Sequence, residues 1–207
     1  NSVDNVNRNG MLRYVFKPVF GVDGYIGGGF SDFSRVDLND CDLGNAILLN
    51  QDFSNANLSY SNLSNSVLYN AQLINAILQR AHLERARLQG AHLQGAHLRG
   101  AHLEGVHLER AYLQGVHLEE AYLEKAHLEG AHLEEAHLEE AHLEGAILQG
   151  ADLIGSYLEG AHLENADLHS AYLDDVDLSV AILDNTILPN GEISCKESDD
   201  KNGGSQK

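Results

Sequence analysis

The sequence of 207 residues contains few basic side chains, only two cysteines and no long apolar run. Its 13 Lys and Arg stand against 31 Asp and Glu, and the resulting net charge of −18 argues against direct binding to nucleic acid or to an anionic membrane. No apolar stretch approaches the roughly 20 residues that a membrane-spanning helix needs. Cys41 and Cys195 lie far apart in the chain, so we expect no disulfide framework and a reducing compartment such as the cytoplasm.

A five-residue repeat dominates the sequence and runs from Ser31 to Asn190 without an insertion or deletion, which makes 32 units. The third residue of each unit is Leu, except at Phe33 and Phe53. On an α-helix, a step of five residues turns the side chain by a net angle of about 140°, so these residues would not share one face. In a flat strand, an odd repeat would exchange the two faces at every unit. The chain must therefore turn once per unit.

The residue types at the five positions predict which side chains face the core. First positions from Ala71 to Ala181 are Ala, Val or Ser, whereas second positions are mostly His and fourth positions mostly Glu. Because strand side chains alternate, the small first residue and the central Leu can face inward while the second and fourth face water. The fifth residue then lies in a corner, where Gly suits a positive φ. These features predict an all-β solenoid with stacked coils.

The repeat resembles the A(D/N)LXX motif of the pentapeptide-repeat family, as in Ala56-Asn57-Leu58, Ala151-Asp152-Leu153 and Ala166-Asp167-Leu168. The ending at residues 186–191 also resembles the way many family members leave the solenoid. The resemblance implies a right-handed quadrilateral β-helix with four units in each coil, and hence about eight coils. The period alone leaves open whether a coil has three sides or four. His at the second position departs from the Asp or Asn of the family.

Three segments are expected along the chain. Residues 1–30 form an N-terminal cap and flexible segment, residues 31–190 form the β-helix, and residues 191–207 form a polar, disordered tail. Within the helix, Phe33 and Phe53 should stack because they are one coil apart. Gln51 occupies an inward position, so its side chain needs a hydrogen-bond partner inside.

Eleven of the twelve histidines occupy second positions, and twenty-residue coils would place them in ladders. The candidate metal-binding or pH-sensing ladder contains His97, His117 and His137. Three hypotheses remain open. Adjacent rungs could share a metal ion, although collinear rungs do not converge on one point. The ladder could sense pH, because histidine ordinarily titrates near pH 6.5. It could also be a solvated stripe copied with the repeat. A second ladder comprises His82, His102, Tyr122, His142 and His162.

Acidic residues form the candidate partner-binding surface. Six of them follow one another at fourth positions with twenty-residue spacing, and four more lie in neighbouring units. Residues 31–190 carry a net −18, because the +1 of residues 1–30 and the −1 of residues 191–207 cancel. At about 4.8 Å per coil this is about one charge per 2 Å, close to the value of about one per 1.7 Å for duplex DNA. The ten residues are Glu84, Glu104, Glu124, Glu144, Glu164, Asp184, Glu119, Glu120, Glu139 and Glu140.

The sequence predicts a binding protein that is not an enzyme and uses no cofactor, because no nucleophile and base are held together in a concave site. The expected partner is a protein with a basic surface, and the expected state is a monomer or an end-to-end dimer. The resemblance implies an alternative, a DNA mimic that binds DNA gyrase, although the C-terminal helical segment and projecting loop of such relatives are missing here. Charging all twelve histidines would change the net charge from −18 to −6, so partner binding should weaken between about pH 7 and 5.5.

Overall fold

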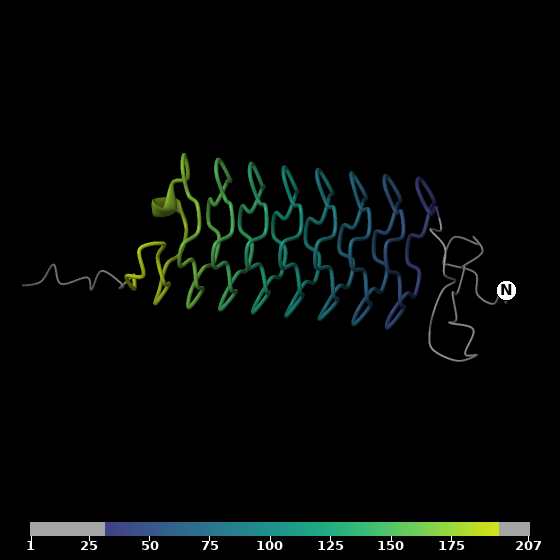
Figure 1. Ribbon diagram of the computed structural model, residues 1–207, viewed down its shortest axis with the longest axis horizontal. Helices are drawn as coiled ribbons and strands as arrows, with labels where there is room; N and C mark the ends of the chain where they lie inside the picture. Colours follow the sequence, from purple (N-terminus) through teal and green to yellow (C-terminus); the bar gives the residue numbers. More distant parts are fainter. Residues whose placement is uncertain (1–31, 195–207) are drawn as a thin grey trace, which may run out of the picture.

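The computed structural model describes residues 32–194, which form a rod of coils stacked along its longest axis (Figure 1). The predicted cap at residues 1–30 and the last thirteen residues of the predicted tail lie outside the described residues. Parallel β-bridges join second-position residues that are twenty apart, as between Tyr112 and His132. One coil therefore contains four five-residue units, as the resemblance implies.

The backbone of each unit bonds to the coils on both sides of it. The N–H of Leu113 donates to the carbonyl of His132 in the next coil at 2.7 Å, and the N–H of Tyr112 donates to Ala91 in the previous coil at 2.9 Å. The fifth and fourth residues form a turn, so each unit contributes a single bridging residue rather than a continuous strand. The polar backbone is thus satisfied between coils, which lets the interior remain apolar.

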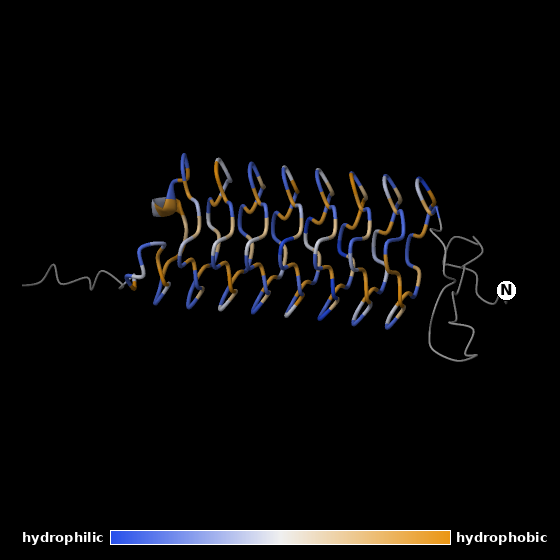
Figure 2. Cartoon of the chain, in the orientation of Figure 1, coloured by the Kyte–Doolittle hydropathy of each residue, from blue (hydrophilic) through white to orange (hydrophobic). Residues whose placement is uncertain are grey.

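The core is a column of leucines and small residues that runs through the rod. From Leu38 to Leu168 every central residue is buried, and most first-position residues are buried with it. Hydrophobic and hydrophilic residues alternate along each coil (Figure 2). Phe33 and Phe53 stack with ring centroids 5.1 Å apart, as predicted. Gln51 is buried, and its Nε2 donates to the carbonyl of Leu49 at 2.7 Å, which supplies the partner that the sequence required.

The corners of the rod require a left-handed backbone. Every fifth residue from Arg35 to Asn185 has a φ of about +54° to +67°, with one exception, Val180. Gly adopts this conformation without steric cost, and Asn and Asp tolerate it better than other residues. The described coils therefore use Asn at many N-terminal corners and Gly at many later ones.

The missing corner at Val180 coincides with the one helical element of the described residues. Residues Leu178–Val180 form the 3₁₀ helix η1, capped by the Asp177 side chain, which accepts from the N–H of Ser179. A β-branched residue at positive φ is a steric outlier. Val180 therefore does not form the usual corner, and the expected bridge from Tyr157 to Asp177 is missing among those described.

Substitutions at one corner test this explanation. A Cβ on Gly115, whose φ is +60°, would meet no atom within 4 Å, so only the backbone conformation limits which residue fits. We expect Gly115→Asn to change the free energy of unfolding by less than about 1 kcal/mol, and Gly115→Val to lower it by about 2 kcal/mol or more. Urea denaturation followed by circular dichroism measures both. Equal stability of the two variants would contradict the explanation.

The C-terminal end of the rod differs from the prediction. The sequence predicts that residues 191–194 belong to the disordered tail, but they turn back onto the last coil, and Ile193 forms an antiparallel bridge with Ile187. The N–H of Ser194 also donates to the carbonyl of Thr186 at 2.8 Å. This reversal covers part of the sheet edge that the last coil would otherwise expose. No helix among residues 32–194 is long and apolar enough to cross a membrane.

Candidate functional site

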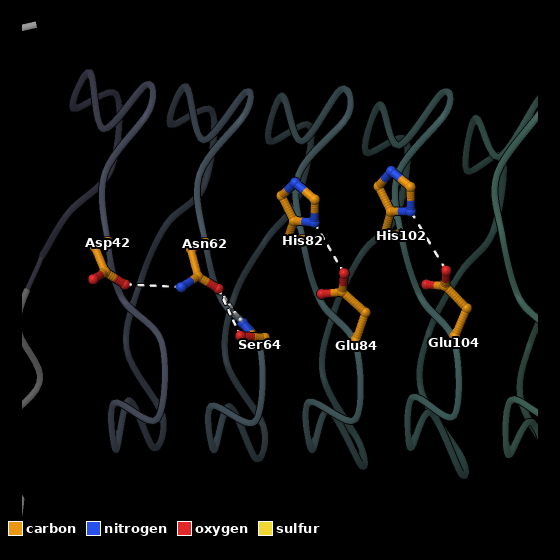
Figure 3. A network of polar contacts seen from close by, with 7 residues as sticks. All are labelled: Asp42, Asn62, Ser64, His82, Glu84, His102 and Glu104. Carbon is orange, nitrogen blue, oxygen red and sulfur yellow. Dashed lines mark hydrogen bonds and ion pairs between the residues drawn. The ribbon is translucent and has the colours of Figure 1, made fainter.

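A histidine and a glutamate of the same unit face each other along much of the rod. Nine of the eleven second-position histidines are followed by Glu at the fourth position. In all nine, the Nδ1 atom lies 2.9 to 3.6 Å from a carboxylate oxygen. Figure 3 shows two of these pairs, His82 with Glu84 at 2.9 Å and His102 with Glu104 at 3.4 Å. This pairing was not expected from the sequence, although the joint occurrence of His and Glu two residues apart indicates it.

The pair takes the place of a different contact in the first coils. There the second residue is often Asp or Asn, and its side chain accepts from the backbone N–H two residues later, as Asn62 does from Ser64 at 3.0 Å. The Asn62 amide also donates to Asp42 one coil earlier at 2.9 Å (Figure 3). A histidine ring instead turns its Nδ1 toward the side chain of the fourth residue. The His–Glu contact thus stands where the Asp or Asn of the family motif would bond to the backbone.

The predicted histidine ladders are present as stacks of rings. His117 lies between His97 and His137, with centroid separations of 4.7 Å on each side and interplanar angles of 9° and 6°. The second ladder, from His82 to His162, stacks in the same way through Tyr122, with separations of 4.8 to 5.1 Å. Successive rungs thus follow the spacing of the coils.

A glutamate lies close to the second-position side chains of two adjacent coils, and the three side chains form a cluster. In each cluster, one atom from each residue, an imidazole nitrogen or a carboxylate oxygen, lies within 4.8 Å of the other two. Four clusters contain two histidines and one glutamate, and no histidine belongs to two clusters. The five clusters are His82–Glu84–His102, His107–Glu109–His127, His117–Glu119–His137, His142–Glu144–His162 and His132–Glu134–Asp152.

The predicted metal or pH ladder is therefore only partly such a cluster. His117 and His137 share Glu119, but the unit of His97 has Arg99 at its fourth position. The Arg99 guanidinium instead donates to the carboxylate of Glu120 in the next coil at 2.6 Å. Whether the ladder binds metal or senses pH stays a prediction.

The glutamates of these clusters are half-buried rather than extended into solvent. Burial raises the pKa of Glu119, but the hydrogen bond with His117 and the electrostatic interactions with His117 and His137 outweigh it, so the pKa lies below its ordinary value. At ten fourth-position glutamates the second carboxylate oxygen is shielded from solvent. This oxygen has no hydrogen-bond partner within residues 32–194. The ten residues are Glu84, Glu104, Glu109, Glu119, Glu124, Glu129, Glu134, Glu139, Glu144 and Glu164. Each cluster thus holds a carboxylate oxygen that accepts no hydrogen bond from the described residues.

The ten predicted partner-binding acids lie on two neighbouring sides of the rod. The bridges stack the units of Glu84, Glu104, Glu124, Glu144, Glu164 and Asp184 in one row. Glu119 and Glu139 lie on the preceding side, and Glu120 and Glu140 occupy the corner between the two sides, both with φ of +57°. Seven acids in this set are already engaged by a guanidinium or imidazole group in a way the sequence did not indicate. Arg99 binds Glu120, and the histidine of the same unit lies against each of Glu84, Glu104, Glu119, Glu139, Glu144 and Glu164.

A cationic groove interrupts the acidic surface, and sequence reasoning missed it. Arg85 and Lys125 occupy the same corner two coils apart, separated by Gly105, and Arg87 lies on the adjoining side. The groove has a volume of about 550 Å³, and its lining contains no acidic residue; it comprises Asn65, Val67, Arg85, Arg87, Gly105, His107, Lys125 and His127. Only the stacking of residues twenty apart brings these cations together. Arg85 and Lys125 belong to the units of Glu84 and Glu124, so the groove borders the acidic row at one corner of the rod.

A rod in which most five-residue units bury one leucine and bond to the coils on both sides is a β-solenoid protein built from short repeats. The family model for pentapeptide repeats matches eight copies over residues 31–68, 66–105, 111–150 and 146–185, and the chain belongs to this family, whose fold is a right-handed β-helix.

The solved structure of HetL agrees with this assignment. The chain is similar to HetL, a pentapeptide repeat protein involved in heterocyst differentiation regulation from the cyanobacterium Nostoc sp. strain PCC 7120. The two are 28% identical with a TM-score of 0.55, over 79% of this chain and 91% of HetL. QnrB1, a plasmid-mediated fluoroquinolone resistance protein, is 20% identical with a TM-score of 0.40, over 76% of this chain and 77% of that chain. A comparison with curated proteins found no match.

Proposed function

We propose that the protein is a non-enzymatic scaffold that binds a protein partner with a basic surface. The observation that carries the proposal is the row of six acidic residues on one side of the rod, at one per coil from Glu84 to Asp184. We further propose that this row lies on a four-sided rod of about eight coils, monomeric or joined end to end in the cytoplasm.

The architecture supports binding by a rigid surface rather than by a concave pocket. Successive rungs are spaced 4.5 to 5.1 Å apart where rings stack, so carboxylates of the row repeat at nearly constant intervals. The backbone between them is fixed by bonds to both neighbouring coils. A regular acidic row complements a basic surface and speeds its association, and it requires little ordering on binding.

A variant in which glutamines replace the glutamates of the row tests the proposal. Glutamine occupies fourth positions in the natural chain, as at Gln89 and Gln114, so Glu→Gln at these positions should preserve the fold. We expect a variant with five such substitutions to bind the partner at least tenfold more weakly. The salt dependence of binding should also fall. The partner is first isolated by affinity purification with the unmodified chain and is then titrated as a purified protein. The row variant replaces Glu84, Glu104, Glu124, Glu144 and Glu164.

The control variant carries the same number of Glu→Gln changes outside the row, at Glu109, Glu129, Glu134, Glu135 and Glu159. It changes the net charge equally, so a specific row predicts that its affinity stays within about threefold of the unmodified chain. Equal weakening of both variants would show that net charge alone attracts the partner, and unchanged binding by the row variant would contradict the proposal outright.

A second candidate function is mimicry of DNA toward DNA gyrase. The charge density favours it, because a net −18 over a rod of about 38 Å approaches the density of duplex DNA. Addition of the chain to gyrase and relaxed DNA should then inhibit supercoiling, and the row variant should inhibit less. Supercoiling that proceeds at an unchanged rate with excess protein would remove this candidate.

A further inference from the structure

We infer that the His–Glu–His clusters bind divalent transition-metal ions such as Zn²⁺, at up to four equivalent sites along the rod. The four sites lie on three sides of the solenoid, at His82–Glu84–His102, His107–Glu109–His127, His117–Glu119–His137 and His142–Glu144–His162. This inference does not depend on a protein partner.

The chemistry of the ligands selects the class of ion. Two imidazole nitrogens and one carboxylate oxygen form a set that suits Zn²⁺, Ni²⁺ or Cu²⁺ better than the oxygen-preferring Ca²⁺ or Mg²⁺. A site with three protein ligands also leaves a position for water, which keeps the ion exchangeable.

In one cluster the carboxylate oxygen lies near the distance from both nitrogens that such an ion requires. Glu144 Oε1 lies 3.3 Å from His142 Nδ1 and 3.8 Å from His162 Nδ1. Ligands about 2.0 to 2.2 Å from a tetrahedral zinc ion are separated from one another by roughly 3.3 to 3.5 Å. The carboxylate oxygen therefore stands near the required distance from both nitrogens.

The parallel rings must tilt for their nitrogen atoms to converge. The rings of His142 and His162 are 4.8 Å apart with an interplanar angle of 14°, so their lone pairs run side by side. About a third of each side chain is exposed to solvent. The glutamate, which belongs to one unit and reaches toward two, supplies the third ligand that collinear rungs lack.

The electrostatic setting favours a cation at these points. The second oxygen of Glu144 is shielded from solvent and has no hydrogen-bond partner among the described residues. A buried, unpartnered carboxylate oxygen is costly, and a bound cation removes that cost. The net charge of −18 adds a long-range attraction for cations.

Isothermal titration of the untagged full-length chain with ZnCl₂ at pH 7.5 tests the inference, with NiCl₂ and CuCl₂ as further probes. We expect a stoichiometry approaching four ions per chain. His137→Asn and His162→Asn should each lower it by one ion, because each removes a ligand from a single cluster. Asn occupies second positions naturally, as at Asn57 and Asn62, so these variants should fold, and circular dichroism checks that they do.

His97→Asn is the matched control. His97 has the same place in its unit and stacks on His117, but Arg99 takes the position of the glutamate. Its replacement should leave the stoichiometry at four. Absence of heat with all three metals would overturn the inference. An equal loss on replacing His97 or His137 would overturn it as well, because it would show binding by histidines irrespective of glutamate. Glu84 and Glu144 belong both to these clusters and to the acidic row, but neither result measures partner binding, so the two proposals fail separately.

Discussion

Replacing Leu113 with Asp should abolish cooperative folding of the rod. Leu113 is 1% exposed and occupies the middle of the leucine column. A carboxylate placed there would lose its hydration and gain no cation, since the coils above and below present Leu93 and Leu133 at the same position. The milder Leu113→Ala should lower the free energy of unfolding by about 2 to 5 kcal/mol. Thermal and urea denaturation monitored by far-ultraviolet circular dichroism measures both variants.

The adjacent residue provides the control. Tyr112 is 37% exposed and stacks between His92 and His132. Tyr112→His introduces the commonest residue of the second position and should change the free energy of unfolding by no more than about 0.5 kcal/mol. A Leu113→Asp variant that melts cooperatively at the temperature of the unmodified chain would show that the central residue does not hold the coils together.

Removing one whole coil of twenty residues should leave a folded, shorter rod. Removing the same coil together with two further residues should not. Deletion of residues 101–120 brings Gly100 next to Ala121 and preserves the twenty-residue register, so every later side chain keeps its side of the rod. Repeat proteins of this kind have a stability that is roughly the sum of their units and interfaces. We therefore expect a cooperative transition with the free energy of unfolding lowered by about an eighth.

Deletion of residues 101–122 is the paired variant. It removes the inward Ala121 and the bridging Tyr122 in addition, and leaves a unit too short to span one side. A coil of eighteen residues cannot pair with neighbours of twenty, so we expect the circular dichroism signal and the cooperative transition to be lost. If both deletions gave equally stable rods, the twenty-residue register would not be the constraint that organises the chain.

The corners and the chain end show where local sequence was sufficient and where it was not. Positive φ at the fifth position follows from the turn that each unit must make, and Gly at ten corners indicated it. The departure at Val180 can also be predicted from the sequence, because a β-branched side chain disfavours the positive φ that a corner requires. The reversal of the chain at Gly191–Ser194 cannot be predicted in this way. It depends on hydrogen bonds to Thr186 and on the Ile187–Ile193 bridge, and no feature of the repeat indicates it.

The amino-acid sequence by itself determined the solenoid, its inward leucines and its acidic surface, because a strict five-residue period imposes the same local constraint on every unit. Only the tertiary structure decided how the outward side chains combine. The turn of each histidine toward a glutamate depends on side-chain geometry within the unit. The meeting of two such histidines, like that of Arg85 with Lys125, depends on a register that joins residues twenty or forty apart. Such contacts are set by stacking between coils, and no property of a single unit specifies them.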